Sequence, residues 1–255
     1  MSTVSPWLFA LIVVAVQMAG WIGGRIIRKR LPPEHLSSST RDAVMLAVGM
    51  VATLTALVLG LMISTAKTSF DADHGSVVEI GTNVLMLDRA LGMYGQEAKP
   101  ARDMLREITR LAIDEVSVEP SSQPKVAPGP PLPHLRELQR QMLQLSPAND
   151  AQRWLQARAL TLSSELERTR VLIAERSDGS IPAAFLLVLL VWLAMLYLAL
   201  AIFAPTNATA SAAAFGGAVA FAAAVFLILE LDRPFHGLVR VSNEALVGTF
   251  QVLGR

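Results

Sequence analysis

The chain has 255 residues, of which 53% are hydrophobic and 17% charged, and its mean hydropathy is +0.46. A composition this apolar excludes an ordinary soluble domain, a disordered chain and collagen, and it favours a membrane protein. The absence of cysteine excludes disulfides, iron–sulfur clusters and thiolate zinc sites. Because 22 basic residues are balanced by 21 acidic ones, the net charge of +1 gives no reason to expect a nucleic-acid partner.

Three stretches without a charged residue predict the membrane spans: residues 1–24, 43–66 and 179–229. A helix needs about 20 apolar residues to cross about 30 Å of hydrocarbon. The first two stretches therefore hold one span each, residues 6–24 and 43–66. The third stretch has 51 residues, enough for two spans, and Pro205-Thr206-Asn207 divides it into 182–203 and 208–229. We therefore predict an all-α integral membrane fold with four transmembrane helices.

The basic residues after the first span predict its orientation. Arg25, Arg28, Lys29 and Arg30 follow the apolar run instead of preceding it, so the segment is typical of an uncleaved anchor and not of a signal peptide. Positive flanks resist translocation, so we expect the loop between the first two spans to be cytoplasmic and the N-terminus to lie outside. Six basic residues flank the membrane on the opposite side, so the side that holds residues 67–178 is left open.

Residues 67–178 predict a water-facing helical bundle inserted between the second and third spans. They carry 14 basic and 16 acidic side chains, with helical spacing of apolar residues and no strand pattern. The second span is expected to continue as one helix to about Tyr94. A second helix is expected to start at Lys99-Pro100 and to end before a Pro-rich linker at residues 120–133, and a short helix is expected after this linker. Ser146-Pro147 would open the last helix, which runs to about Arg176 and whose apolar positions would be Trp154, Ala157, Leu162, Leu166 and Ile173.

This pattern divides the chain into four segments. Residues 1–66 hold the first two spans and the basic loop, residues 67–178 the bundle, residues 179–229 the last two spans and residues 230–255 an interfacial C-terminal segment. In that last segment Ser242 would cap a short helix whose apolar face includes Phe250 and Leu253. We expect this helix to lie on the bilayer surface or to pack against the bundle.

No motif in the sequence supports catalysis or a bound cofactor. The four histidines fall in separate segments, and His74 with Asp71 and Asp73 offers too few ligands for a metal site. There is no nucleophile elbow, no phosphate-binding loop and no dinucleotide fingerprint. We therefore predict no catalytic, cofactor-binding or metal-binding residues, and a protein that is not an enzyme.

The second span carries a stripe of small residues at three- and four-residue steps: Gly49, Thr53, Ala56, Gly60 and Ser64. Such a stripe lets helix backbones approach closely, and its hydroxyls could also line a narrow pore. Both interpretations stay open. No ionisable residue lies in the middle of any span, which speaks against a proton-coupled transporter.

The chain resembles a bacterial bestrophin-like family of unknown function. The resemblance rests on the order of elements, on RIIRKRLPPEHL after the first span, on LVLGLMISTAKTSFD running into VVEIGTNVLMLDRAL, and on the ending LDRPFHGLVRVSNEAL. Its most specific part is a C-terminal motif of Asp232, Arg233, Pro234, Phe235, Gly237, Arg240 and Ser242. The resemblance implies kinship with pentameric anion channels whose second helix forms a hydrophobic neck, although the second span here has no aromatic residue before Phe70.

Two hypotheses follow for the function. In the first, a homo-oligomer in the bacterial inner membrane surrounds an ion path with its second spans. In the second, the spans anchor a structural or sensory module that acts through the bundle at residues 67–178. Either protein would contact membrane lipid.

Overall fold

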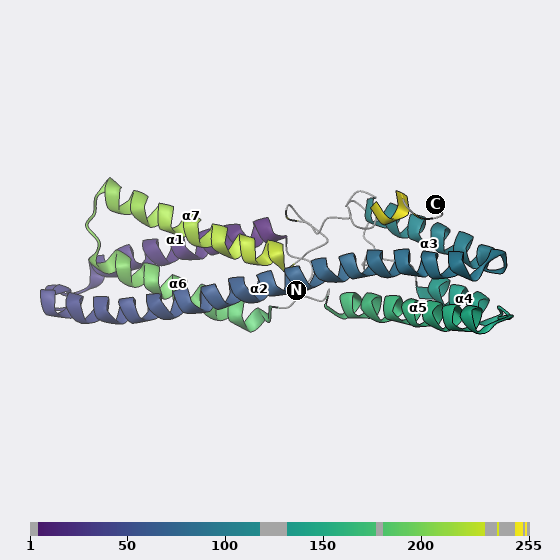
Figure 1. Cartoon of the computed structure of the whole chain (residues 1–255). Helices are drawn as coiled ribbons and strands as arrows, with labels where there is room; N and C mark the ends of the chain where they lie inside the picture. Colours follow the sequence, from purple (N-terminus) through teal and green to yellow (C-terminus); the bar gives the residue numbers. More distant parts are fainter. Residues whose placement is uncertain are drawn as a thin grey trace. The chain divides into compact units, whose positions relative to one another are not determined.

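The computed structural model describes residues 5–117, 132–176, 181–232, 239, 248–251 and 253. Within these residues the chain is helical and forms no strand (Figure 1). The elements are α1 (Pro6–Arg30), η1 (Pro33–Leu36), α2 (Ser38–Tyr94), η2 (Gln96–Ala98), α3 (Lys99–Ser117), α4 (Leu132–Leu143), α5 (Asp150–Arg176), α6 (Ala183–Phe203) and α7 (Ala208–Leu231).

Four of these helices are long and apolar enough to cross a membrane: α1, α2, α6 and α7. This confirms the all-α fold with four candidate spans. The predicted continuation of the second span to Tyr94 is also confirmed: α2 runs from Ser38 to Tyr94, and Gly75 and Gly81 do not interrupt it. The chain forms two compact units, Met1–Ser69 with Gly179–Arg233 (unit 1) and Phe70–Asp178 with Pro234–Arg255 (unit 2), so α2 contributes to both.

In unit 1, α1 packs against α6 and α7 (Figure 1). Two glycines one turn apart on α1 allow its backbone to approach α6 closely. A Cβ atom added to Gly20 would lie 2.7 Å from the carbonyl oxygen of Ala194, and one on Gly24 would lie even closer to that of Leu198. No side chain fits between the two backbones at these points.

The predicted break between the last two spans is present, and its residues take distinct roles. The α6 helix ends at Phe203, and Pro205 lies in the connection. Asn207 is the N-cap of α7, where its side-chain oxygen accepts a hydrogen bond of 2.8 Å from the backbone N–H of Ala210. The cap satisfies one of the N–H groups that have no partner within the helix.

In unit 2, the second half of α2 packs with α3, α4 and α5 around an aliphatic core. Its fully buried side chains include Ile80, Leu87, Leu91, Leu105, Ile108, Leu135, Leu138, Met142, Leu162, Leu166 and Ile173. The core therefore buries large side chains from each of these four helices. The chain turns from α2 into η2 at Gly95, whose φ of 125° falls in the region that L side chains rarely adopt.

The predicted start of the last bundle helix is wrong. Helix α5 begins at Asp150, and Ser146-Pro147 precedes it in irregular structure. Asn149 is the better cap, because its side-chain oxygen accepts from the Gln152 N–H at 2.8 Å while the Gln152 side chain accepts from the Ala148 N–H. This reciprocal pair fixes the helix start three residues later than the Ser-Pro signal indicates.

The predicted apolar face of this helix is also partly wrong. Trp154 and Ala157 are exposed, and Trp154 keeps 64% of its surface accessible. The buried positions in that part of α5 are Leu155 and Ala159, which continue the face of Leu162, Leu166 and Ile173. The difference arises because an isolated aromatic residue suggests a core position even where it lies outside the periodic series.

Candidate functional site

The small-residue stripe predicted on the second span lies on the exposed face of α2. All five residues are exposed in the chain: Gly49, Thr53, Ala56, Gly60 and Ser64. At about 100° per residue they fall within one arc of about 80° around the helix axis. A Cβ atom added to Gly49 or Gly60 would meet no atom within 4 Å. Among the described residues, the stripe therefore takes no part in packing between helices.

The opposite side of α2 is the side that unit 1 buries. Thr55, Met62 and Ala66 are buried there, roughly half a turn around the helix from the stripe. The Thr55 hydroxyl donates to the carbonyl of Val51 at 2.7 Å, so burying it leaves no unsatisfied donor. This assignment of faces means that the stripe points away from the interior of unit 1.

An apolar ridge runs beside the stripe on the exposed surface of α2. Its members are Leu46, Met50, Leu54, Leu57 and Leu61, each at least half exposed. Together with the stripe they give one face of the helix two strips of different chemistry, one small with hydroxyl groups and one large and aliphatic. A surface of this kind in the membrane meets lipid, another subunit or an ion path.

The stripe contains two hydroxyl groups and no charge. The Thr53 hydroxyl donates to the carbonyl oxygen of Gly49 at 2.9 Å, which leaves the lone pairs of its oxygen available to a cation or to water. Residues 43–66 hold no ionisable side chain. The face can therefore accompany an ion without binding it tightly.

The predicted C-terminal motif lies almost wholly outside the described residues. Only Asp232 is described, as the C-cap of α7, where its backbone N–H donates to the carbonyl oxygens of Glu230 and Ile228. The other motif residues are Arg233, Pro234, Phe235, Gly237, Arg240 and Ser242. Farther along the chain, Phe250 and Leu253 pack into the core of unit 2.

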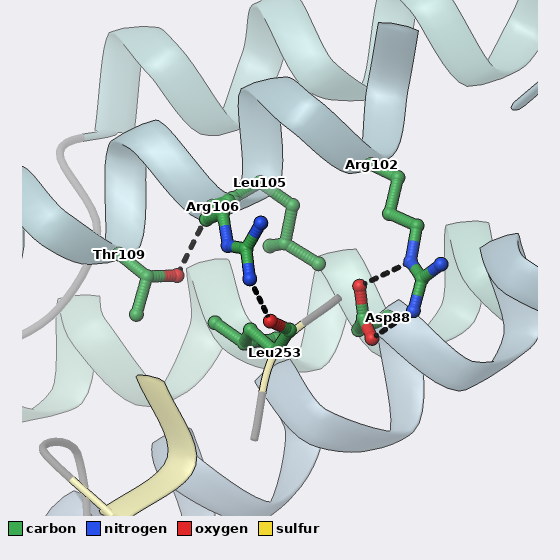
Figure 2. A network of polar contacts seen from close by, with 6 residues as sticks. All are labelled: Asp88, Arg102, Leu105, Arg106, Thr109 and Leu253. Carbon is green, nitrogen blue, oxygen red and sulfur yellow. Dashed lines mark hydrogen bonds and ion pairs between the residues drawn. The ribbon is translucent and has the colours of Figure 1, made fainter. Parts of the chain in front are cut away.

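A polar network in unit 2 joins α2, α3 and the C-terminal residues (Figure 2). Arg102 binds the Asp88 carboxylate with two hydrogen bonds of 2.6 and 2.8 Å, and Arg106 donates to the backbone carbonyl of Leu253. The hydrogen bonds that Arg102 donates to the nearly buried Asp88 carboxylate raise the pKa of Arg102, so this guanidinium stays charged. The network fixes α3 against α2 and does not contact the stripe.

Unit 2 also contains a polar hollow of about 230 Å³ between α2 and α5. Ser76 and Glu79 line it from α2, and Glu165, Arg168 and Thr169 line it from α5. Among the described residues no group of three His, Asp or Glu side chains is arranged to hold a metal ion. The hollow and the stripe lie in different units.

Sequence reasoning missed three features of unit 1. Arg25 and Arg28 bind the α6–α7 turn. Arg28 donates a hydrogen bond to the carbonyl oxygen of Ala204, and Arg25 donates to the carbonyl oxygen of Pro205 at 3.3 Å and to the Ser211 hydroxyl at 3.2 Å. Gly20 and Gly24 are the close-packing glycines, and their spacing of four residues is the signal that could have found them.

The third missed feature is Gln17, which is fully buried in α1. Neither its amide nitrogen nor its amide oxygen has a hydrogen-bond partner among the described residues. A single amide within a charge-free span was visible in the sequence. Its burial depends on how α6 and α7 cover α1, which the sequence pattern does not specify.

These observations define an all-helical membrane protein with four candidate spanning helices and an uncharged small-residue face on the second. The bestrophin-like domain model matches residues 14–246, and the chain therefore belongs to the bestrophin-like family. The fold is similar to the crystal structure of a bacterial bestrophin homologue from Klebsiella pneumoniae carrying a point mutation, with a TM-score of 0.64 at 15% identity over 95% of each chain. A search of curated proteins gives no significant match.

Proposed function

We propose that this protein is a homo-oligomeric ion channel of the bacterial inner membrane, in which the α2 helices of several subunits surround the ion path. The observation that carries the proposal is the stripe from Gly49 to Ser64, which is exposed in the chain and free of charge. Membership of the bestrophin-like family supports it.

The two strips on α2 suggest how the subunits would meet. In the proposed assembly the apolar ridge from Leu46 to Leu61 packs against the neighbouring α2 helix, and the stripe faces the axis. Glycine and alanine keep the path open at three levels, and the hydroxyls of Thr53 and Ser64 replace part of the ion's hydration shell. Because no charge lies in the path, selectivity would depend on pore width and on dipoles.

The test is ion flux in proteoliposomes, measured with chloride and with potassium gradients. We expect Thr53→Leu and Ser64→Leu to reduce flux at least about tenfold, since each narrows the path with an aliphatic side chain. Thr65→Leu is the matched control. Thr65 is exposed on the same helix and also carries a hydroxyl, but it lies about 100° around the axis from Ser64.

Two results would contradict the proposal. One is a wild-type protein that conducts neither ion. The other is a flux that falls equally in the Thr65→Leu control, because the loss would then follow from any leucine on the exposed surface of α2. Light scattering in detergent must also show an assembly of several subunits, since a single α2 helix cannot enclose a path.

A further inference from the structure

The four cations at the end of α1 fall into two pairs. Arg25 and Arg28 turn toward the α6–α7 connection and donate to its carbonyls and to Ser211. Lys29 and Arg30, the last two residues of the helix, are exposed and have no hydrogen-bond or ion-pair partner among the described residues. The first pair therefore serves the fold of unit 1, and the second pair is available to a ligand.

The local charge around the free pair is positive. Residues 25–42 contain five basic and two acidic side chains, a net charge of +3. The two acids, Glu34 and Asp42, are exposed and form no ion pair with Lys29 or Arg30 within the described part of the chain. The surface at this end of unit 1 consequently attracts anions.

The free cations continue an apolar face of the same helix. Ile22, Ile26 and Arg30 follow one another at four-residue steps, which places them on one side of α1. Ile22 and Ile26 are 58% and 48% exposed although they lie within a candidate spanning helix. An exposed aliphatic face that ends in long cationic side chains is complementary to a lipid. The acyl chains would lie along the aliphatic residues, and the charged headgroup would lie beside the cations.

We propose that this face of α1 binds an anionic phospholipid, with an acyl chain along Ile22 and Ile26 and the phosphate held by Lys29 and Arg30. The unpaired charges select a headgroup with a net negative charge over a zwitterionic one, whose own cation would be repelled. The inference concerns the exterior of unit 1 and does not depend on whether the protein conducts ions.

The experiment is lipid binding to the full-length protein in detergent, followed by native mass spectrometry. The probes are phosphatidylglycerol and phosphatidylcholine with identical acyl chains. We expect the wild type to prefer phosphatidylglycerol, and Lys29→Gln with Arg30→Gln to lower that affinity about 30-fold, which corresponds to about fivefold for each charge. Lys29→Arg with Arg30→Lys should keep the preference.

The control removes the same charge elsewhere. Arg89 and Arg158 are exposed in unit 2, and Arg89→Gln with Arg158→Gln should leave lipid binding unchanged. If the double variant at the end of α1 does not fold, the single variants Lys29→Gln and Arg30→Gln carry the comparison, each with a loss of about fivefold.

Binding of the two lipids with equal affinity would overturn the proposal, as would an equal loss in the unit 2 control. Ile22→Ala with Ile26→Ala tests the acyl contact and should weaken binding severalfold. If that variant binds normally and inorganic phosphate displaces the lipid, the site recognises a soluble anion and the lipid assignment is wrong.

Discussion

The contacts inside unit 1 differ in kind from the contacts inside unit 2. In unit 1 the closest approach is between backbones, where Gly20 and Gly24 of α1 meet the carbonyls of α6. In unit 2 large aliphatic side chains such as Leu87, Leu105 and Leu138 fill a core, and an ion pair joins two of its helices. The difference follows from the solvent: water drives aliphatic side chains together, whereas lipid does not, so helices in lipid gain mainly from close packing.

Within unit 1 the glycines themselves differ. Gly20 and Gly24 have no room for a methyl group, while a Cβ atom added to Gly49 or Gly60 on α2 would have no neighbour within 4 Å. The first pair is explained by contacts inside one chain. No contact among the described residues explains the second pair, and our proposal for α2 builds on this difference.

Gly24→Ala tests the packed side of this comparison and should have the largest effect. Its Cβ would overlap the Leu198 carbonyl oxygen, a backbone atom that cannot rotate away, so we expect a loss of about 3 kcal/mol or more. Thermal unfolding in detergent measures it. Gly23→Ala is the matched control, because its methyl group meets nothing and should raise helix stability slightly. Equal melting of the two variants would show that α1 and α6 are not closely packed.

Leu105→Ala tests the aliphatic core of unit 2. Leu105 is fully buried on α3, so removing three carbons should leave a cavity and cost about 3 kcal/mol. Leu143→Ala, at an exposed end of α4, should change stability by no more than about 0.5 kcal/mol. Chemical denaturation followed by far-ultraviolet circular dichroism measures both. A small loss at Leu105 would mean that side-chain burial does not hold this unit together.

Arg102→Met tests the ion pair in the same unit. It leaves the Asp88 carboxylate nearly buried and without the two hydrogen bonds that Arg102 donates, which should cost about 2 kcal/mol. Arg110→Met is the control, because Arg110 and Glu107 form an exposed pair that water and salt screen, so its loss should change stability much less. The same denaturation assay decides, and comparable losses would show that burial of Asp88 is unimportant.

Most of the fold could be predicted from the sequence because the membrane imposes simple rules. Charge-free stretches located the spans, and Pro205 with Asn207 located the turn between the last two. The continuation of α2 to Tyr94 followed from its apolar spacing. Helix boundaries in unit 2 were harder to predict, since Ser146-Pro147 and Asn149 both carry capping chemistry, and only the surrounding contacts decide which one starts α5.

The residues of the candidate site could be predicted from their spacing, but their exposure could not. The spacing from Gly49 to Ser64 identified one helix face, yet the same spacing occurs where helices pack, as at Gly20 and Gly24. How α1 meets α6 and α7 depends on tertiary contacts such as the hydrogen bonds from Arg25 and Arg28 to the α6–α7 turn. The sequence shows these arginines only as positive flanking residues, which predict orientation and not contacts.

Gly60→Ala tests the open side of the comparison and has the smallest expected effect on stability. Its methyl group meets nothing in the chain, and alanine is a better helix former than glycine by about 1 kcal/mol, so the melting temperature should rise slightly. Light scattering in detergent then separates the two interpretations of the stripe. If it lines a path, the assembly stays intact while flux falls. If it packs helices of neighbouring subunits, the added methyl group separates them and the assembly dissociates, which would move the ion path away from α2.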